Sequence, residues 1–99
     1  MNESIDLDAF VEFAVPILKG MANQHRLDIV NLLLKKPATV NNLANSLSLP
    51  QPVISQHLRI LKKSDLVRCT ITGHYRLYEV GLREIEPLLG VISLLKAEH

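Results

Sequence analysis

Residues 39–63 combine two short helical patterns with a break of only a few residues between them, and few folds accommodate that arrangement. Apolar residues at three- and four-residue steps predict a first helix over about 39–46, for which Thr39 is a suitable N-cap. A stretch of Ser and Leu that ends at Pro50 interrupts the pattern, and the next apolar stripe predicts a second helix over about 51–63. Residues 39–63 are therefore predicted to form a helix-turn-helix.

The apolar period changes directly after this segment. Val67, Cys69 and Ile71 alternate with polar residues, which predicts one strand over about 67–72, and residues 74–80 are predicted to form the returning strand. Gly73 supplies the turn between them. A hairpin in this place is the wing of a winged helix-turn-helix, and we expect the wing to span about residues 66–80.

Three further helices flank this unit. Apolar stripes predict them over about 7–20, 24–35 and 82–95, with Gly20 as the C-cap of the first and Pro87 delaying the start of the last by about a turn. The predicted fold class is mainly α with a small β-hairpin, in the order of four helices, two strands and a fifth helix. No internal repeat or linker divides the chain, so we expect a single domain over residues 1–99.

The charges of the chain are segregated, although the net charge is only +1. Residues 51–76 contain five Lys or Arg residues and a single acid, whereas residues 1–30 and 77–99 are acidic. A basic helix face taken alone is as often a solvated surface as a nucleic-acid contact. Its position in a helix-turn-helix followed by a hairpin favours the nucleic-acid partner.

The helix over 51–63 has the two faces that a DNA-reading helix needs. The major groove is about 12 Å wide and admits one helix, which must also pack on its own domain. Apolar residues form the inner face, and polar residues near the start of the outer face suit base edges: Gln51, Pro52, Ser55 and Gln56. The residues predicted to contact the DNA backbone are Thr39, His57, Arg59, Lys62, Lys63, Arg68, His74 and Arg76.

The stretch Leu49-Pro50-Gln51-Pro52-Val53-Ile54-Ser55-Gln56-His57-Leu58-Arg59-Ile60-Leu61 resembles the recognition helix of the ArsR/SmtB repressors. Residues 23–30, Leu66-Val67-Arg68, Gly73 and Tyr78 are similar to other parts of that family's pattern, and the resemblance covers about residues 8–98. It implies a homodimer that occupies a palindromic operator and blocks transcription. Its base contacts fall on Gln51, Ser55 and Gln56, while Pro52 replaces a usual Ser or Thr and His74 stands at a commonly basic wing-tip position.

Many members of that family sense metal ions, but the positions that the resemblance assigns to their ligands are unsuitable here. Thr39 and Asn42 stand where a Cys and an acid are needed for a site on the third helix. An intersubunit site at the last helix falls on Leu82, Glu84, Leu95 and Glu98, which include no imidazole. We therefore expect no metal and no cofactor, and the sequence identifies no effector.

Cys69 is the only cysteine, so the chain cannot form an internal disulfide. Its alternation with Val67 and Ile71 favours a small buried hydrophobe over a redox sensor.

The first and last helices are the predicted dimer surface. Hydrophobic residues make up 47% of the 99-residue chain, which is more apolar surface than a small core hides. The last helix in particular has a wide apolar arc. The residues predicted to form the interface are Phe10, Phe13, Ile17, Leu88, Leu89, Val91, Ile92 and Leu95.

The two other classes of function are an enzyme and a module for protein contacts. No nucleophile paired with a base, no phosphate-binding glycine loop and no carboxylate pair argue for an enzyme. A winged-helix module for protein contacts, without sequence-specific DNA binding, is the alternative to the regulator. The acidic, polar start and the short apolar runs indicate a cytoplasmic protein without a membrane partner.

Overall fold

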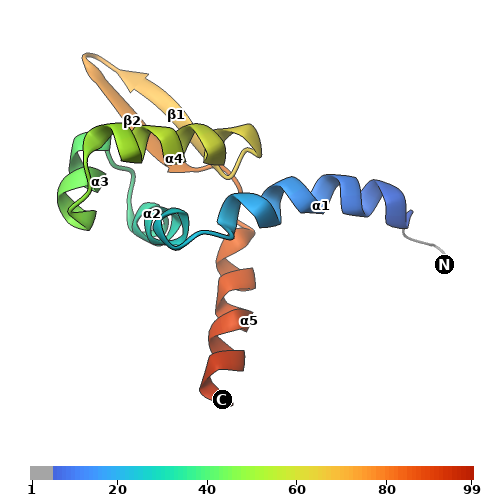
Figure 1. Cartoon of the computed structure of the whole chain (residues 1–99). Helices are drawn as coiled ribbons and strands as arrows, with labels where there is room; N and C mark the ends of the chain where they lie inside the picture. Colours follow the sequence, from blue (N-terminus) through green and yellow to red (C-terminus); the bar gives the residue numbers. More distant parts are fainter. Residues whose placement is uncertain (1–5) are drawn as a thin grey trace.

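The computed structural model describes residues 6–99, which form five helices and one two-stranded sheet (Figure 1). In chain order the elements are α1 (Leu7–Met21), α2 (Gln24–Lys35), α3 (Val40–Leu47), α4 (Gln51–Lys63), β1 (Val67–Thr72), β2 (Tyr75–Val80) and α5 (Ile85–Ala97). This order confirms the predicted winged helix-turn-helix, with α3 and α4 as the helix-turn-helix and the hairpin as the wing.

Three helices and the base of the wing form the packed body of the molecule, and the two outer helices project from it. Figure 1 shows α1 extending to one side and α5 extending downward. The wing lies on the side of α4 opposite to α2 and α5. The extents of 50 × 33 × 20 Å reflect these projections.

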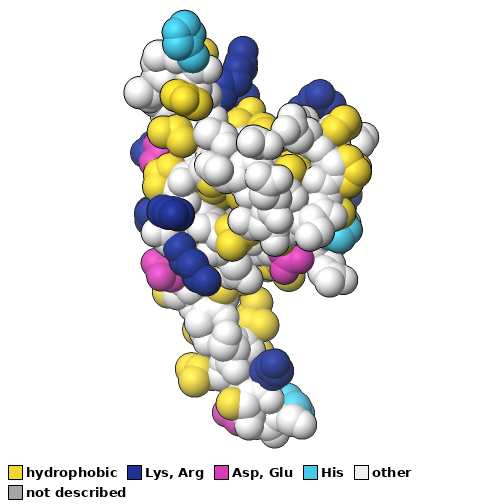
Figure 2. All heavy atoms as spheres, turned by 90° about the vertical axis from the view of Figure 1, so that its left-hand side faces the viewer, with side chains coloured by type: hydrophobic (Ala, Val, Ile, Leu, Met, Phe, Trp, Pro, Cys, Tyr) yellow, Lys and Arg dark blue, Asp and Glu magenta, His cyan; other side chains and the backbone are white. Residues whose placement is uncertain are grey.

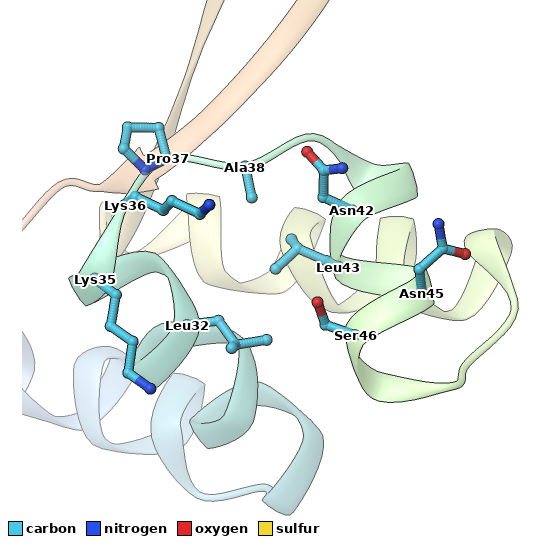
Figure 3. Close-up of a pocket in the computed structure, with 9 residues that line it drawn as sticks. All are labelled: Leu32, Lys35, Lys36, Pro37, Ala38, Asn42, Leu43, Asn45 and Ser46. Carbon is cyan, nitrogen blue, oxygen red and sulfur yellow. The ribbon is translucent and has the colours of Figure 1, made fainter.

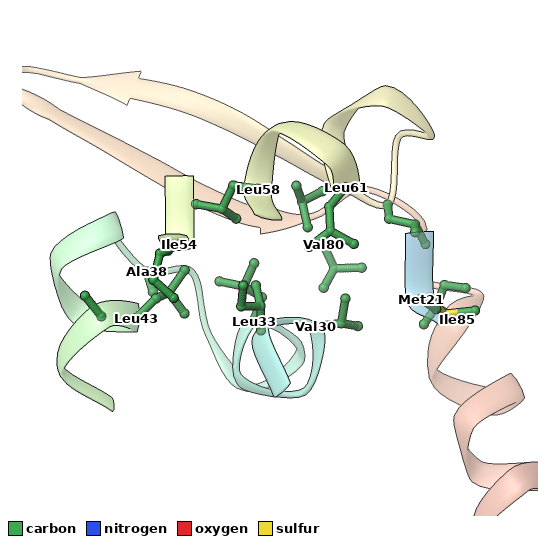
Figure 4. Packing of buried hydrophobic residues seen from close by; sticks show 14 residues of the cluster. Met21, Val30, Leu33, Ala38, Leu43, Ile54, Leu58, Leu61, Val80 and Ile85 are labelled. Atoms are coloured by element: carbon green, nitrogen blue, oxygen red, sulfur yellow. The ribbon is translucent and has the colours of Figure 1, made fainter. Parts of the chain in front are cut away.

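The hydrophobic core lies between α2, α3, α4 and the base of the wing (Figure 4). It takes one apolar face from each helix, as the three- and four-residue spacing predicts. Its buried residues are Met21, Ile29, Val30, Leu33, Ala38, Leu43, Ala44, Ile54, Leu58, Leu61, Leu66, Val67, Val80 and Ile85.

Local interactions fix the start and the end of α3. The Thr39 side chain accepts a hydrogen bond from the Asn42 backbone N–H at 3.1 Å, and the Asn42 side chain accepts one from the Thr39 N–H at 3.3 Å. This capping box satisfies two N–H groups that the first turn leaves free. Ser48, in the left-handed region with φ 54°, ends α3, and Pro50 with φ −61° leads directly into α4.

The wing is an antiparallel hairpin in which Val67 pairs with Val80 at its base and Thr72 pairs with Tyr75 at its tip. Gly73, with φ 60°, occupies the first position of the two-residue loop, where a side chain would be strained. At mid-strand, Tyr78 exchanges two backbone hydrogen bonds with Ala38, at 2.8 and 3.0 Å. These bonds tie the wing to the segment that leads into α3.

Some predicted details were wrong. Gly20 does not close α1: the helix continues to Met21, and Gly20 is buried where an added Cβ would lie 2.8 Å from Leu66 Cδ1. Gly20 therefore allows close packing and does not supply a C-cap. His74 belongs to the turn, so β2 begins at Tyr75. The last helix begins at Ile85, about a turn after Leu82, in keeping with the delay expected from Pro87.

Candidate nucleic-acid interface

α4 carries the residues predicted to read bases, and α3 braces its first turn. Gln51 Nε2 donates a hydrogen bond to Asn41 Oδ1 of α3 at 2.8 Å. Gln51, Pro52 and Gln56 are exposed, and Ser55 is half-buried. The inner face of α4, made of Ile54, Leu58 and Leu61, is fully within the core. The base-reading candidates therefore lie at the polar start of a helix whose inner face is buried in the core.

The cations of α4 face the wing across a hollow of about 400 Å³. Its lining residues are Ser55, Arg59, Lys62, Lys63 and Tyr78. Three cations around one concave surface create a positive potential that attracts phosphate groups. The structure thus brings one base-reading candidate and three backbone-contact candidates together.

Tyr78 also lines this hollow, although it was not among the residues predicted to contact DNA. Its side chain is half-buried, and burial, followed by the neighbouring Cys69, raises the pKa of its phenol above the ordinary 10.0. The phenol therefore keeps its proton at neutral pH, next to the Cys69 thiol. Its place beside the α4 cations depends on how the wing packs, which the sequence alone does not show.

The cationic residues of the wing lie on different sides of the hairpin. Arg76 pairs with Ile71 and shares its side with Tyr78, because side chains alternate along a strand. Arg68 lies on the opposite side, where its Nε donates to Glu79 Oε2 at 3.1 Å. His74 is exposed in the turn. Arg76 and His74 are thus free to approach DNA, whereas Arg68 is already paired with an acid.

His57 does not face outward. Its Nδ1 lies 3.3 Å from a guanidinium nitrogen of Arg26, and its ring centre lies 5.6 Å from that of His25. Burial, then Arg26 and then His25 lower the pKa of His57 below its ordinary value. A neutral, inward-turned imidazole is a poor phosphate contact, so we leave His57 out of the proposed DNA surface.

The face formed by α3 and the start of α4 has few charged side chains at its centre. Figure 2 views the molecule from this side, with the wing at the top and α5 at the bottom, and shows Lys and Arg side chains around an uncharged central area. Hydrogen-bonding groups without charge suit base edges, and surrounding cations suit phosphates.

Thr39 and Asn42 serve the architecture of α3 in this structure. Both belong to the capping box, and Asn42 also lines a hollow of about 340 Å³ between α2 and α3 (Figure 3). Lys36 and Ala38 border the same hollow from the connecting segment. Thr39 is half-buried at the start of α3, where its hydroxyl hydrogen remains available to an acceptor.

The predicted dimer residues lie on the two projecting helices. Phe10, Phe13, Leu88, Val91, Ile92 and Leu95 are exposed, whereas Ile17 and Leu89 pack partly against the core. Further exposed apolar side chains lie on the same helices: Leu7, Val11, Val15, Leu18 and Leu94. Phe13 retains 70% of its accessible surface and Leu94 66%. Several large apolar side chains exposed to this extent on the same helices are typical of a surface that binds a partner.

Comparison with known proteins places the chain in a family. The model of the bacterial regulatory proteins of the arsR family matches residues 23–68. The transcriptional activator HlyU of Vibrio cholerae is 33% identical over 82 residues, which cover 83% of this chain and 76% of HlyU. The transcriptional repressor SmtB of Mycobacterium tuberculosis is 34% identical over 71 residues, which cover 72% of this chain and 53% of SmtB.

The chain belongs to the ArsR family of bacterial transcriptional regulators. Its fold matches that of a Mycobacterium bovis fragment described as a homodimeric winged helix-turn-helix DNA-binding domain, with a TM-score of 0.84. That match covers 100% of this chain and 93% of the fragment at 24% sequence identity, and it bears on the fold alone. The resemblance inferred from the recognition-helix residues is thereby confirmed, and the relatives are regulators of transcription, not enzymes.

In this ArsR-family chain, the positions that correspond to the intersubunit metal site of relatives lie at the two ends of α5. Leu82 and Glu84 precede α5, and Leu95 and Glu98 lie at its far end. Over residues 6–99, no three His, Cys, Asp or Glu side chains gather as a metal site would require.

Two further predictions concern Cys69 and membranes. Cys69 is half-buried opposite Tyr78, and not fully buried as expected. In the described part of the chain, no helix has both the length and the apolar character to cross a membrane.

Proposed function

We propose that this ArsR-family regulator is a homodimer, with one domain per chain, that binds duplex DNA sequence-specifically through α4 in the major groove. The residues proposed to read base edges are Gln51, Pro52, Ser55 and Gln56. The residues proposed to contact phosphates are Thr39, Arg59, Lys62, Lys63, Arg68, His74 and Arg76.

The observation that carries the proposal is the basic hollow between α4 and the wing. Arg59, Lys62 and Lys63 line it, directly beyond the uncharged start of α4. Recognition helices meet base edges with their N-terminal residues, while cations further along contact the backbone. The order of side chains along α4 supports this docking.

The proposed dimer follows from the exposed apolar sides of α1 and α5. A monomer that leaves this much contiguous apolar surface in water is prone to associate. Two coupled recognition helices read half-sites about 34–36 Å apart, and a two-fold axis makes the site palindromic. The dimer surface on α1 and α5 lies away from the wing, so association leaves α4 free for DNA (Figure 1).

The proposed regulatory effect is repression, because a dimer bound across promoter DNA excludes the polymerase from it. The relatives include one named an activator and one named a repressor, so the direction is tested separately. A reporter gene under the promoter of the chain's own gene, with and without the protein, measures it. Lower reporter output with the protein is expected, and higher output contradicts repression.

DNA binding itself is tested by titrating the protein with a duplex from that promoter and with a random duplex of equal length, each at two salt concentrations. The specific duplex is expected to bind more tightly, and affinity for both should fall with salt by roughly 0.9 in log–log slope per phosphate contacted. Lys62→Ala should reduce that slope by about 1, whereas Lys96→Ala on α5 is the matched control and should leave it unchanged. Equal affinity for both duplexes, or binding that does not respond to salt, contradicts the proposal.

A further inference from the structure

Arg26 belongs to α2 and lies where α1, α2 and α4 meet. Its side chain contacts both α1 and α4. Its Nε donates to the Gly20 carbonyl oxygen at 2.7 Å, and its Nη2 donates to that of Lys19 at 3.4 Å. Its Nη1 lies 3.3 Å from Nδ1 of His57, in the middle of α4. One side chain therefore connects the C-terminal end of α1 with the helix proposed to read DNA.

The contact between Arg26 and His57 requires a neutral imidazole. A guanidinium group has five N–H donors and no acceptor, so Nη1 can donate to Nδ1 only when Nδ1 carries no proton. The imidazole proton then resides on Nε2. If His57 were protonated, Nδ1–H would point at another donor, and two positive charges would face each other at 3.3 Å.

The groups around this pair do not compensate for a second positive charge. Among residues 6–99, no carboxylate lies within 4.0 Å of the cationic nitrogens of Arg26 or His57. Besides Arg26, α2 contributes His25 to the pair's surroundings. Asp28 is two residues beyond Arg26 and so lies on the other side of α2.

The other elements packed against α4 bring no free acid to His57. α3 has no titratable side chain. On β1, Arg68 is paired with Glu79, and Cys69 lies opposite Tyr78. On α1, Glu12 lines a hollow with Ser64 and Asp65 beyond the C-terminal end of α4. Lys19, whose carbonyl oxygen accepts from Arg26, is a cation. The charged groups of α4 itself, namely Arg59, Lys62 and Lys63, are cations.

We propose that Arg26 is a positioning residue for DNA binding, which fixes α4 against the end of α1 through neutral His57, and that protonation of His57 releases α4. This inference rests on the proposed function. It assigns to α1 a link to the recognition helix in addition to the apolar surface that it offers for dimerisation. Because the contact between Arg26 and His57 needs a neutral imidazole, the affinity of the protein for DNA falls as the pH is lowered.

The pH range follows from the direction of the His57 shift. Its pKa is lowered below 6.5, so the imidazole is neutral at pH 7.5 in both the folded and the unfolded chain. As the pH falls below 6.5, the unfolded chain takes up the proton first, and the folded arrangement loses stability until the lowered pKa is reached. Below that pKa, DNA affinity falls by about tenfold per pH unit for each α4 that must be neutral to bind.

The first measurement needs no DNA. Nitrogen-15 NMR of the histidine side chains in the full chain gives the tautomer and the pKa of each imidazole. His57 is expected to carry its proton on Nε2 at pH 7.5 and to have a pKa below the ordinary 6.5. In Arg26→Gln the neighbouring positive charge is gone, so the pKa of His57 should rise, a change that a purely structural role of Arg26 would not cause.

The second measurement is DNA affinity between pH 8 and pH 5, with the promoter duplex as the probe. His57→Asn keeps an acceptor near the Nδ1 position but cannot take up a proton. It should bind like the wild type at pH 7.5 and lose the steep acid response, whereas His99→Asn, the matched control, should keep that response. The other histidines are unchanged in His57→Asn, so the contribution of His57 is the difference between the acid responses of wild type and His57→Asn.

The outcomes separate this inference from the proposed function. A proton on Nδ1 of His57 at pH 7.5, or an acid response of His57→Asn as steep as that of the wild type, overturns the inference alone. Failure of the wild type to bind the duplex at any pH overturns the proposed function and the role of Arg26 in DNA binding with it. The NMR result then still decides whether Arg26 and His57 are coupled.

Discussion

α4 and α5 are both 13 residues long and both have apolar stripes, yet they stand in opposite relations to the core. α4 buries Ile54, Leu58 and Leu61 and turns a polar, basic face to solvent. α5 buries only Ile85 and leaves large apolar side chains exposed along most of its length, as the lower part of Figure 2 shows. α4 is thus complete within one chain, and α5 is not.

This difference shows that an apolar stripe indicates which side of a helix must be covered, but not which surface covers it. A stripe opposite a polar face, as in α4, identifies a helix that one domain covers. α5 is apolar on more than one side, with Leu88 and Leu94 exposed on different strips. An isolated helix of this length is marginal in water, so its stability requires a covering surface. The sequence pattern indicates that such a covering surface is needed, and residues 6–99 of a single chain do not provide it.

The largest expected effect tests the buried side of this comparison. Leu58→Ala removes a side chain that is 1% exposed, and the cavity should lower the free energy of unfolding by about 2–5 kcal/mol. Leu94→Ala, at a concentration low enough to keep the chain monomeric, should change it by less than about 0.5 kcal/mol. Urea unfolding followed by circular dichroism measures both. Equal losses would show that α5 is covered within the monomer.

The exposed side of the comparison is tested by placing a charge on it. Ile92→Glu puts a carboxylate into the proposed interface and should raise the dimer dissociation constant at least about 100-fold, or roughly 2.8 kcal/mol. Ser93→Glu is the matched control, because Ser93 lines a hollow on the side of α5 turned to α2. Sedimentation equilibrium measures both variants. An Ile92→Glu protein that stays dimeric removes this part of α5 from the interface.

Most of the fold could be predicted because its boundaries are marked by local chemistry. Thr39 accepts a backbone hydrogen bond at the start of α3, as predicted for an N-cap. Gly20 was misjudged, because a glycine that ends a helix and one that allows Leu66 to approach look identical in a single sequence. The deciding contact comes from residues more than 40 positions away.

The candidate site was harder to predict for the same reason. From the sequence we predicted His57 to contact the DNA backbone, although helical periodicity puts it at the border between the inner and outer faces of α4. The choice is made by Arg26, 31 positions earlier in the chain. Arg68 and Glu79 likewise meet only through the register of the hairpin. Periodicity orders residues around their own helix or strand, but it does not show which residue of another element they meet.

A smaller effect separates the two kinds of contact proposed for the outer face of α4. Gln56→Ala should weaken binding to the promoter duplex by about 1–3 kcal/mol and relax the base preference at one position, because it removes the base contact proposed for Gln56. Lys62→Ala should weaken specific and random duplexes alike. Competition binding against a library of single-base variants distinguishes them. If both substitutions affect all sequences equally, Gln56 does not read a base.

The smallest effect concerns Arg68, the basic residue of the wing that lies away from the hollow beside α4. Its exposed pair with Glu79 should contribute only about 0.2–1 kcal/mol to folding, so Arg68→Ala should hardly change the urea midpoint. The same variant should reduce the salt slope of DNA binding less than Lys62→Ala does, because Glu79 already offsets the charge of Arg68. Glu79→Gln removes that offset and should strengthen DNA binding if Arg68 reaches a phosphate. Unchanged affinity in Glu79→Gln would place Arg68 outside the DNA surface and confine the basic contacts of the protein to α4 and the opposite side of the wing.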